Sequence, residues 1–257
     1  VTLDGQGADE AMGGYPYFFG FYYKELLAQI RLLKLFKELK DYWSNHHSTY
    51  AYKTFLYFLL PGRLKKNVRI REKGYLTRDF SNHEFHSLIS QELYSSQTVN
   101  AALINHFEYK MEHLLKWQDL NSMKFSIEAR EPFLDYRMVE GLLTIKPDKL
   151  ISGGMTKMIL REAMQGILPE KIRMRKDKIG FETPQNEWFK TRKFEALIND
   201  ILNSDSFKNR NIVDVRKARI LFKSFLDGKI DLSKEIWKWV NLELWFRKYI
   251  DGNELVL

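Results

Sequence analysis

The chain has 257 residues, of which 44% are apolar and 29% charged, a balance typical of globular domains with a substantial core. The absence of cysteine excludes disulfides and thiolate groups, and no apolar run is long enough to span a bilayer. The net charge of +8 fits phosphorylated small molecules, nucleic acid or anionic lipid without choosing among them. Because the first residue is Val1, we expect a fragment boundary there. The lack of cysteine and of a membrane-spanning run leads us to expect a cytoplasmic protein without a membrane partner.

The chain begins with a short apolar segment over residues 1–3 that predicts the end of a strand. Two glycines around Gln6 then predict a tight turn over residues 4–7. The rest is predicted to be mostly helical, because apolar residues recur at intervals of three and four over residues 24–43, 100–120, 156–165 and 234–250. Prolines mark breaks between these helices, at positions 132, 147, 169 and 184.

A strand, a glycine turn and then helices are what remain when a parallel α/β sheet is cut after one of its strands. A single helical body is therefore the simplest architecture. Val1 and Leu3 are expected to lack cover from neighbouring strands. The aromatic run from Tyr15 to Tyr23 is interpreted as buried packing.

The turn and the residues after it, Gly5-Gln-Gly-Ala-Asp-Glu10, form the first candidate site. A glycine turn at the end of a strand lets backbone N–H groups approach an anion, and a helix beginning near Ala8 adds its positive dipole end. Asp9 and Glu10 would repel a phosphate, but they suit Mg²⁺, which binds carboxylate and phosphate oxygens together. On these residues alone, a plain turn with an acidic helix start explains the pattern equally well.

Three further segments place charges where chemistry is plausible. In residues 121–135, Glu128, Arg130 and Asp135 have apolar neighbours, so these charges are predicted to form a fixed ion-pair network. Considered by itself, this segment indicates a structural role and not a catalytic one. Lys157 and Arg161 lie one helical turn apart and are predicted to point the same way. Residues 173–184 place Lys178 before a close-approach glycine. An isolated lysine is usually a solvated surface charge, although a compact ammonium group also suits pyrophosphate.

In this order, the four segments resemble the asparagine synthetase family. That family carries Leu-Ser-Gly-x-Gly-x-Asp-Glu at a strand end, then Ser-Met and Glu-Ala-Arg-x-Pro-Phe-Leu-Asp, then Lys-x-x-Leu-Arg, then Lys-x-Gly-Phe-x-x-Pro. The likeness spans Val1 to about Trp188, and residues 1–257 are expected to be the C-terminal part of one synthase domain. The resemblance implies a mainly α fold, which is the helical C-terminal portion of an α/β ATP-pyrophosphatase-type domain with a residual N-terminal strand.

The resemblance also implies an ATP-dependent ligase that adenylates a carboxylate, most commonly aspartate, and forms an amide with ammonia from glutamine. Asp9 is then expected to hold Mg²⁺ beside the pyrophosphate, while Lys157 and Lys178 neutralise the phosphates. The expected binding site for ATP and the acyl-adenylate also includes further residues of the first and third segments, namely Gly5, Gln6, Gly7, Glu10 and Arg161.

Gln6 stands where some relatives have a glutamate that has been considered a base or a substrate-positioning group. An amide has no useful proton affinity near neutral pH, so Gln6 cannot be that base. Glu128, another carboxylate or no specific group is left for this role. Two further departures, Asp4 in place of serine and Leu120 in place of arginine, support no ligand assignment.

Two parts of the family pattern are not found within these residues: the Ser-Gly-Gly-x-Asp-Ser pyrophosphate turn and a glutaminase domain with a cysteine nucleophile. Ser152-Gly-Gly154 lacks the Asp-Ser pair and is interpreted as a loop before the lysine helix. We therefore expect this chain alone to be inactive and to need the N-terminal glutaminase domain as a partner. The resemblance is also compatible with a homodimer.

Other interpretations stay open. The chain is also explained by a non-catalytic helical binding or scaffold module derived from this family, or by a relative that acts on a sugar, peptide or other carboxylate. Nucleic acid is not an expected partner, because the basic stretch over residues 63–73 lacks regular aromatic residues and fits a solvated face or a contact with an acidic domain. His83 and His86 lack a third ligand, so no zinc site is expected.

Overall fold

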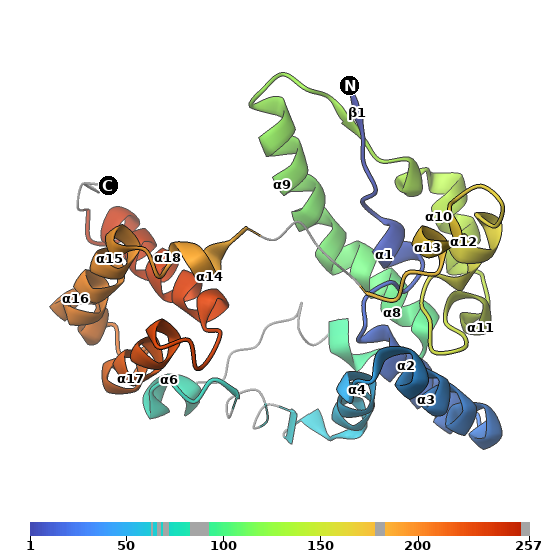
Figure 1. Ribbon diagram of the computed structural model, residues 1–257, viewed down its shortest axis with the longest axis horizontal. Helices are drawn as coiled ribbons and strands as arrows, with labels where there is room; N and C mark the ends of the chain where they lie inside the picture. The colour runs from blue at the N-terminus through green and yellow to red at the C-terminus, as the bar shows by residue number, and fades with distance from the viewer. Residues whose placement is uncertain (63, 66–67, 69–71, 83–92, 178–182, 253–257) are drawn as a thin grey trace. The chain divides into compact units, whose positions relative to one another are not determined.

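The computed structural model describes residues 1–62, 64–65, 68, 72–82, 93–177 and 183–252. The chain divides into two compact units, where the sequence pattern predicts one helical body. Unit 1 comprises residues 1–61 and 86–178, and unit 2 comprises residues 62–85 and 179–257. The order of the elements can be followed from blue to red in Figure 1. Among the described residues, no helix combines the length and the apolar character needed to cross a membrane.

The predicted N-terminal strand is confirmed, and it has a partner that the sequence pattern does not predict. Strand β1 (Thr2–Leu3) pairs in parallel with β2 (Ala129–Arg130). The Thr2 N–H donates to the Glu128 carbonyl at 2.8 Å, and the Asp4 N–H donates to the Arg130 carbonyl at 2.9 Å. This pairing places the residues just before the first candidate site, Gly5–Glu10, beside the second segment, residues 121–135. As expected, the side chains of β1 are largely uncovered, since Leu3 is 76% exposed.

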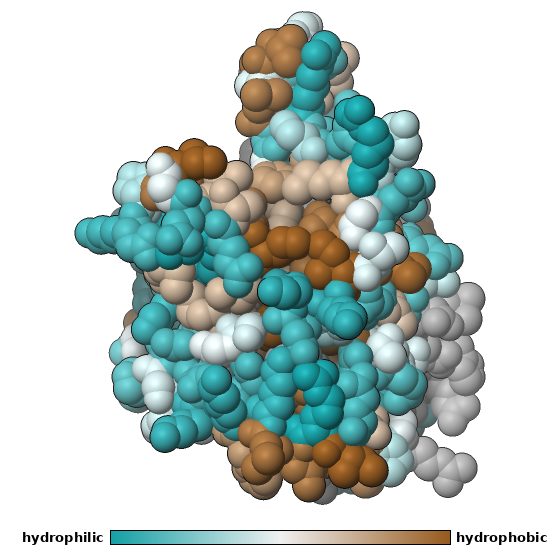
Figure 2. All heavy atoms as spheres, turned by 90° about the vertical axis from the view of Figure 1, so that its right-hand side faces the viewer, coloured by the Kyte–Doolittle hydropathy of each residue, from teal (hydrophilic) through white to brown (hydrophobic). Residues whose placement is uncertain are grey.

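The helices of unit 1 surround a largely aromatic core. Phe18, Phe21, Tyr22 and Tyr23 of one helix are buried, as predicted for the aromatic run. Figure 2 shows one face of the molecule, with separate apolar patches in brown. The helical segments in chain order are α1 (Ala8–Ala11), α2 (Phe18–Ala28), α3 (Leu32–His46), α4 (Tyr50–Leu59), α8 (Val99–His106), the π-helix η1 (Phe107–Met111), α9 (Glu112–Met123), the 3₁₀-helix η2 (Pro132–Leu134), α10 (Tyr136–Leu143), α11 (Pro147–Leu150), α12 (Met158–Ala163) and α13 (Glu170–Arg173).

The prediction of one helix over residues 24–43 is wrong, because the chain breaks between α2 and α3. Ile30 adopts a left-handed backbone conformation with φ of 57°, which ends the helical hydrogen bonding. The new helix starts beside Asp148, whose carboxylate accepts Arg31 Nη2 at 2.6 Å and lies 2.8 Å from Lys34 Nζ. The Tyr22 hydroxyl also donates to it at 2.8 Å. These contacts tie α2 and the start of α3 to α11.

Asp148→Asn is expected to reduce the stability of the chain at neutral pH, and this difference should shrink as the pH falls from 4 to 2. Burial alone would raise the pKa of Asp148, but hydrogen bonds from Arg31, Lys34 and Tyr22 outweigh it and hold the pKa at about 2, below the ordinary 3.8. The contribution is therefore full above about pH 4 and is lost as the pH falls towards 2. Urea unfolding of both proteins across this range measures it, and a difference that stays constant with pH would contradict it.

Unit 2 is a cluster of helices around a second apolar core. Its buried side chains include Phe222, Phe225, Ile236 and Trp239. The last helix, α18 (Ser233–Tyr249), confirms the prediction for residues 234–250. The other described helices of this unit are α6 (Arg78–Asn82), α14 (Gln185–Trp188), α15 (Arg192–Asn203), α16 (Asp205–Asn209) and α17 (Val215–Leu226).

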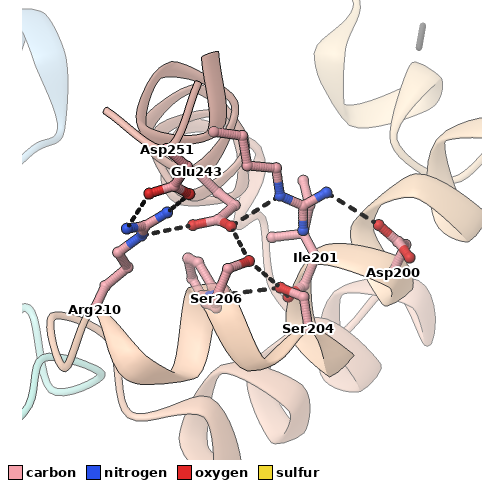
Figure 3. A network of polar contacts seen from close by, with 9 residues as sticks. Asp200, Ile201, Ser204, Ser206, Arg210, Glu243 and Asp251 are labelled. Atoms are coloured by element: carbon pink, nitrogen blue, oxygen red, sulfur yellow. Dashed lines mark hydrogen bonds and ion pairs between the residues drawn. The ribbon is translucent and has the colours of Figure 1, made fainter. Parts of the chain in front are cut away.

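A buried carboxylate, that of Glu243 in α18, joins the helices of unit 2 (Figure 3). It accepts Arg247 Nε at 2.9 Å and Arg210 Nε at 3.4 Å, and it also accepts the Ser206 hydroxyl. Each arginine has a second carboxylate partner: Arg210 Nη1 donates to Asp251 at 3.0 Å, and Arg247 Nη1 to Asp200 at 3.3 Å. The charge of Glu243 is therefore paired in the way that a buried carboxylate requires.

Candidate functional site

Gly7, in the first candidate site, packs closely against Leu134 of the second segment (residues 121–135). Its backbone is left-handed, with φ of 88°, and a Cβ at this position would lie 2.2 Å from Leu134 Cδ2. No residue other than glycine fits both the conformation and the space. Gly5 lies in open space, and its N–H donates to the Asp4 carboxylate at 2.5 Å. The expected turn is confirmed, and helix α1 begins at Ala8 as predicted.

The two acidic side chains of α1, those of Asp9 and Glu10, differ in their exposure to solvent. Glu10 is 1% exposed and accepts a hydrogen bond from the Tyr15 hydroxyl, so it faces the interior. The Asp9 side chain is 24% exposed, although its Oδ1, the oxygen nearest Lys157, is buried. Of the two carboxylates, Asp9 is thus the one that a solvated cation can reach.

Asp9 forms an ion pair with Lys157, so the first candidate site lies beside the third segment, which contains Lys157 and Arg161. Lys157 Nζ lies 2.6 Å from Asp9 Oδ1, and the lysine side chain is 26% exposed. Lys157 directly precedes α12 rather than lying on it, and its φ is 55°, in the left-handed region. For a residue other than glycine, this conformation persists only when its surroundings hold it, and such strain clusters at functional sites. A fixed cation therefore lies beside a partly exposed carboxylate.

The backbone of Gly14 lies against this ion pair. A Cβ on Gly14 would be 1.9 Å from Asp9 Oδ1 and 2.2 Å from Lys157 Cε, so only glycine leaves room for both side chains. The Gly14 N–H also donates to the Asp9 carbonyl at 2.8 Å. Gly14 is not among the site residues predicted from the sequence.

Aromatic residues and a second cation lie behind Glu10. The Tyr15 and Tyr17 rings stack with centroids 5.3 Å apart, and Lys110 Nζ lies 3.3 Å from the Tyr15 ring centroid. The Tyr17 hydroxyl lies 2.7 Å from Nε2 of His106. This histidine is buried, and its burial lowers its pKa to about 4. Burial also raises the pKa of both tyrosines, so these hydroxyls stay protonated at neutral pH. Glu10 is therefore held by the hydroxyl of Tyr15, whose ring packs against Tyr17 and the ammonium group of Lys110.

Arg161 does not share the position of Lys157. Its Nε donates to the Thr156 carbonyl at 2.8 Å and its Nη1 to the Arg173 carbonyl at 2.5 Å. Burial lowers its pKa, and nearby Arg173 adds to this effect. The two side chains contact different groups, because Lys157 lies before the helix and Arg161 within it. The predicted role of Arg161 in binding ATP stays a prediction.

Glu128 forms an exposed ion pair with Arg130, with 2.9 Å between the carboxylate and Arg130 Nε. The hydrogen bond from Arg130 lowers the pKa of Glu128, which makes its carboxylate a weaker base. Asp135 pairs with Arg137 at 2.7 Å, so the predicted network of three charges is replaced by two separate pairs. Lys178, His83 and His86 lie outside the described residues.

Magnesium is the metal that the sequence predicts here. The described part of the chain contains no group of three or more histidine or acidic residues that could hold a metal ion by itself. Mg²⁺ is usually held by one or two carboxylates together with substrate phosphates. Asp9, accessible and next to a lysine, fits a metal that a nucleotide helps to hold.

Comparison with known proteins identifies the family. Residues 1–247 match the family described as asparagine synthase. The chain belongs to this family. It is 28% identical to asparagine synthetase (glutamine-hydrolyzing) 1 of Bacillus subtilis over 264 residues, which cover 95% of this chain and 40% of that protein.

Two further relatives match shorter parts of the chain. Asparagine synthetase (glutamine-hydrolyzing) 3 of Bacillus subtilis is 28% identical over 68% of this chain and 25% of its own length. The asparagine synthetase (glutamine-hydrolyzing) of Rattus norvegicus is 27% identical over 48% of this chain and 25% of its own length. The chain thus spans less than half of each of these relatives. No solved structure matches it significantly. The mainly α fold with two short strands agrees with the fold class predicted for this part of the family.

Proposed function

We propose that this chain forms part of a cytoplasmic ATP-dependent ligase that adenylates a carboxylate and converts it to an amide with ammonia from glutamine. The observation that carries the proposal is the contact of 2.6 Å between Asp9 and Lys157. It brings two of the four motifs of the family together at one partly exposed place. A carboxylate beside an ammonium group suits a magnesium–pyrophosphate leaving group, which needs both a ligand for the metal and a cation for its phosphates.

In this proposal, Asp9 holds Mg²⁺, and the metal neutralises charge on the phosphates when it is bound. Lys157 contributes a second positive charge where negative charge develops on the leaving pyrophosphate. Lys178 is proposed as a further phosphate lysine. Gly5, Gln6 and Gly7 are proposed to line the acyl-adenylate, since Gly5 leaves open space beside the chain.

The acceptor carboxylate is proposed to be aspartate, as the names of the relatives suggest. Gln6 cannot act as a base, and the lowered pKa of Glu128 weakens it in this role. Deprotonation of the attacking amine therefore has no strong candidate among these residues. We further propose that this chain alone is inactive and binds Mg-ATP more weakly than micromolar, because it contains no Ser-Gly-Gly-x-Asp-Ser turn.

The proposal is tested by ATP–pyrophosphate exchange in the complete gene product. Exchange that depends on an added carboxylate, measured with aspartate and a panel of other carboxylates, is the expected result and identifies the acceptor. Glutamine should then support amide formation as well as ammonia does. If no carboxylate supports exchange or AMP release, the ligase proposal fails and a non-catalytic module is favoured.

A further inference from the structure

We infer that Glu38 is a positioning residue that fixes Lys157 by binding the loop that leads to it. This inference rests on the proposed function, because it concerns the same phosphate lysine. The loop, Ser152–Met155, is called the glycine loop below. It was predicted only as a connection before the lysine helix.

The Glu38 carboxylate binds two consecutive backbone N–H groups of the glycine loop. Glu38 lies in α3 and is 2% exposed. Its Oε1 accepts the Gly153 N–H and its Oε2 accepts the Gly154 N–H, each at 3.1 Å. Both oxygens of a buried carboxylate are therefore used to fix the backbone of a loop that lies 115 residues away in the sequence.

The same helix also holds the carbonyl groups of these glycines. Asn45 Nδ2 donates to the Gly153 carbonyl at 2.8 Å, and His46 Nε2 lies 2.8 Å from the Gly154 carbonyl. Gly154 has a φ of 68°, and a Cβ there would lie 2.5 Å from the Tyr42 backbone nitrogen. The glycine loop thus packs directly on the backbone of α3 and has its peptide groups bound on both sides.

This attachment reaches Lys157 through a short and rigid path. Backbone hydrogen bonds of 3.1 and 3.0 Å between Ser152 and Met155 close the glycine loop. Only Thr156 separates the loop from Lys157, whose left-handed backbone must be held by its surroundings. A shift of the loop would therefore move Lys157 Nζ away from its place beside Asp9. Displacements of about 1 Å at a catalytic group can lower a rate by about a hundred-fold.

The test uses ATP–pyrophosphate exchange in the complete gene product with three single variants. Glu38→Gln keeps the size of the side chain but replaces one acceptor oxygen by an amide NH₂ that faces a glycine N–H. Lys157→Ala removes the proposed phosphate lysine. The matched control is Glu25→Gln, because Glu25 is also a buried glutamate that accepts a backbone N–H, that of Val99 at 2.7 Å, but does not contact the glycine loop.

Glu38→Gln is expected to lower kcat for exchange by about ten- to a hundred-fold, while Glu25→Gln leaves kcat unchanged even where its melting temperature falls as far. In the Lys157→Ala background, Glu38→Gln should cause no further loss, because the group that it positions is gone. Asn45→Ala, which removes only the bond to the Gly153 carbonyl, is a milder second variant that should lower kcat in the same Lys157-dependent way if Glu38→Gln does not fold.

The inference is overturned if Glu38→Gln behaves like Glu25→Gln, or if the losses of Glu38→Gln and Lys157→Ala multiply. For Asn45→Ala, unchanged kcat or a loss that multiplies with that of Lys157→Ala has the same meaning. Failure of the proposed function looks different, since Lys157→Ala alone would then exchange at the wild-type rate.

Discussion

Asp9→Asn in the complete gene product is expected to lower the rate of ATP–pyrophosphate exchange by about a hundred- to a thousand-fold. Asparagine keeps the shape of the side chain and a carbonyl oxygen, but it loses the negative charge that Mg²⁺ needs. It also removes the ion pair that holds Lys157 at 2.6 Å. Both electrostatic groups of the proposed site are thus weakened by one change of an oxygen to an NH₂ group.

Asp227→Asn is the matched control, because Asp227 also pairs with a lysine, Lys229, at 2.9 Å, but in unit 2. Exchange by this variant should equal that of the wild type. Both side chains of the ion pair are about three-quarters buried, so Asp9→Asn is also expected to lower the melting temperature, and exchange is measured well below the melting transition of each variant. Undiminished exchange by Asp9→Asn would remove Asp9 from the site.

Glu243→Gln is expected to destabilise unit 2 by about 3 kcal/mol. The side chain is fully buried, and its carboxylate is the acceptor shared by Arg210 and Arg247 (Figure 3). An amide pairs poorly with two guanidinium groups and places its NH₂ against one of them. The loss falls at the lower end for a broken buried ion pair because each arginine keeps a second carboxylate.

Urea unfolding followed by tryptophan fluorescence measures this effect, because four of the six tryptophans lie in unit 2, at positions 188, 237, 239 and 245. Glu187→Gln, at an exposed position of the same unit, is the control and should leave the midpoint unchanged. A Glu243→Gln midpoint equal to that of the wild type would show that the network contributes no net stability.

The parts of the fold that follow from local pattern were predictable. The glycine turn, the start of α1 at Ala8 and the helix over 234–250 each depend on neighbours within a few residues. The break at Ile30 was not predictable in this way, because the apolar spacing continues across it. It is set by Asp148, which binds Arg31 and Lys34 from far along the sequence. The partner of β1 was missed for the same reason.

In the candidate site, too, some residues could be predicted from local pattern, and others depend on contacts with distant parts of the chain. The motifs identify Asp9 and Lys157, and the structure brings them together. The roles of Gly14 and Glu38 do not appear in the sequence, since they depend on what packs against them. Glu38 in particular reads as one more charged residue on a helix, and only the fold shows its carboxylate bound to the glycine loop.

Lys157 is proposed to bind pyrophosphate, and calorimetric titration of the complete gene product with magnesium pyrophosphate tests this binding most directly. Lys157→Gln is expected to weaken the affinity by about ten-fold or more, the loss of a hydrogen bond between charged groups. Lys149→Gln, an exposed lysine in α11, should bind like the wild type. Equal affinities for the wild type and Lys157→Gln would contradict the claim.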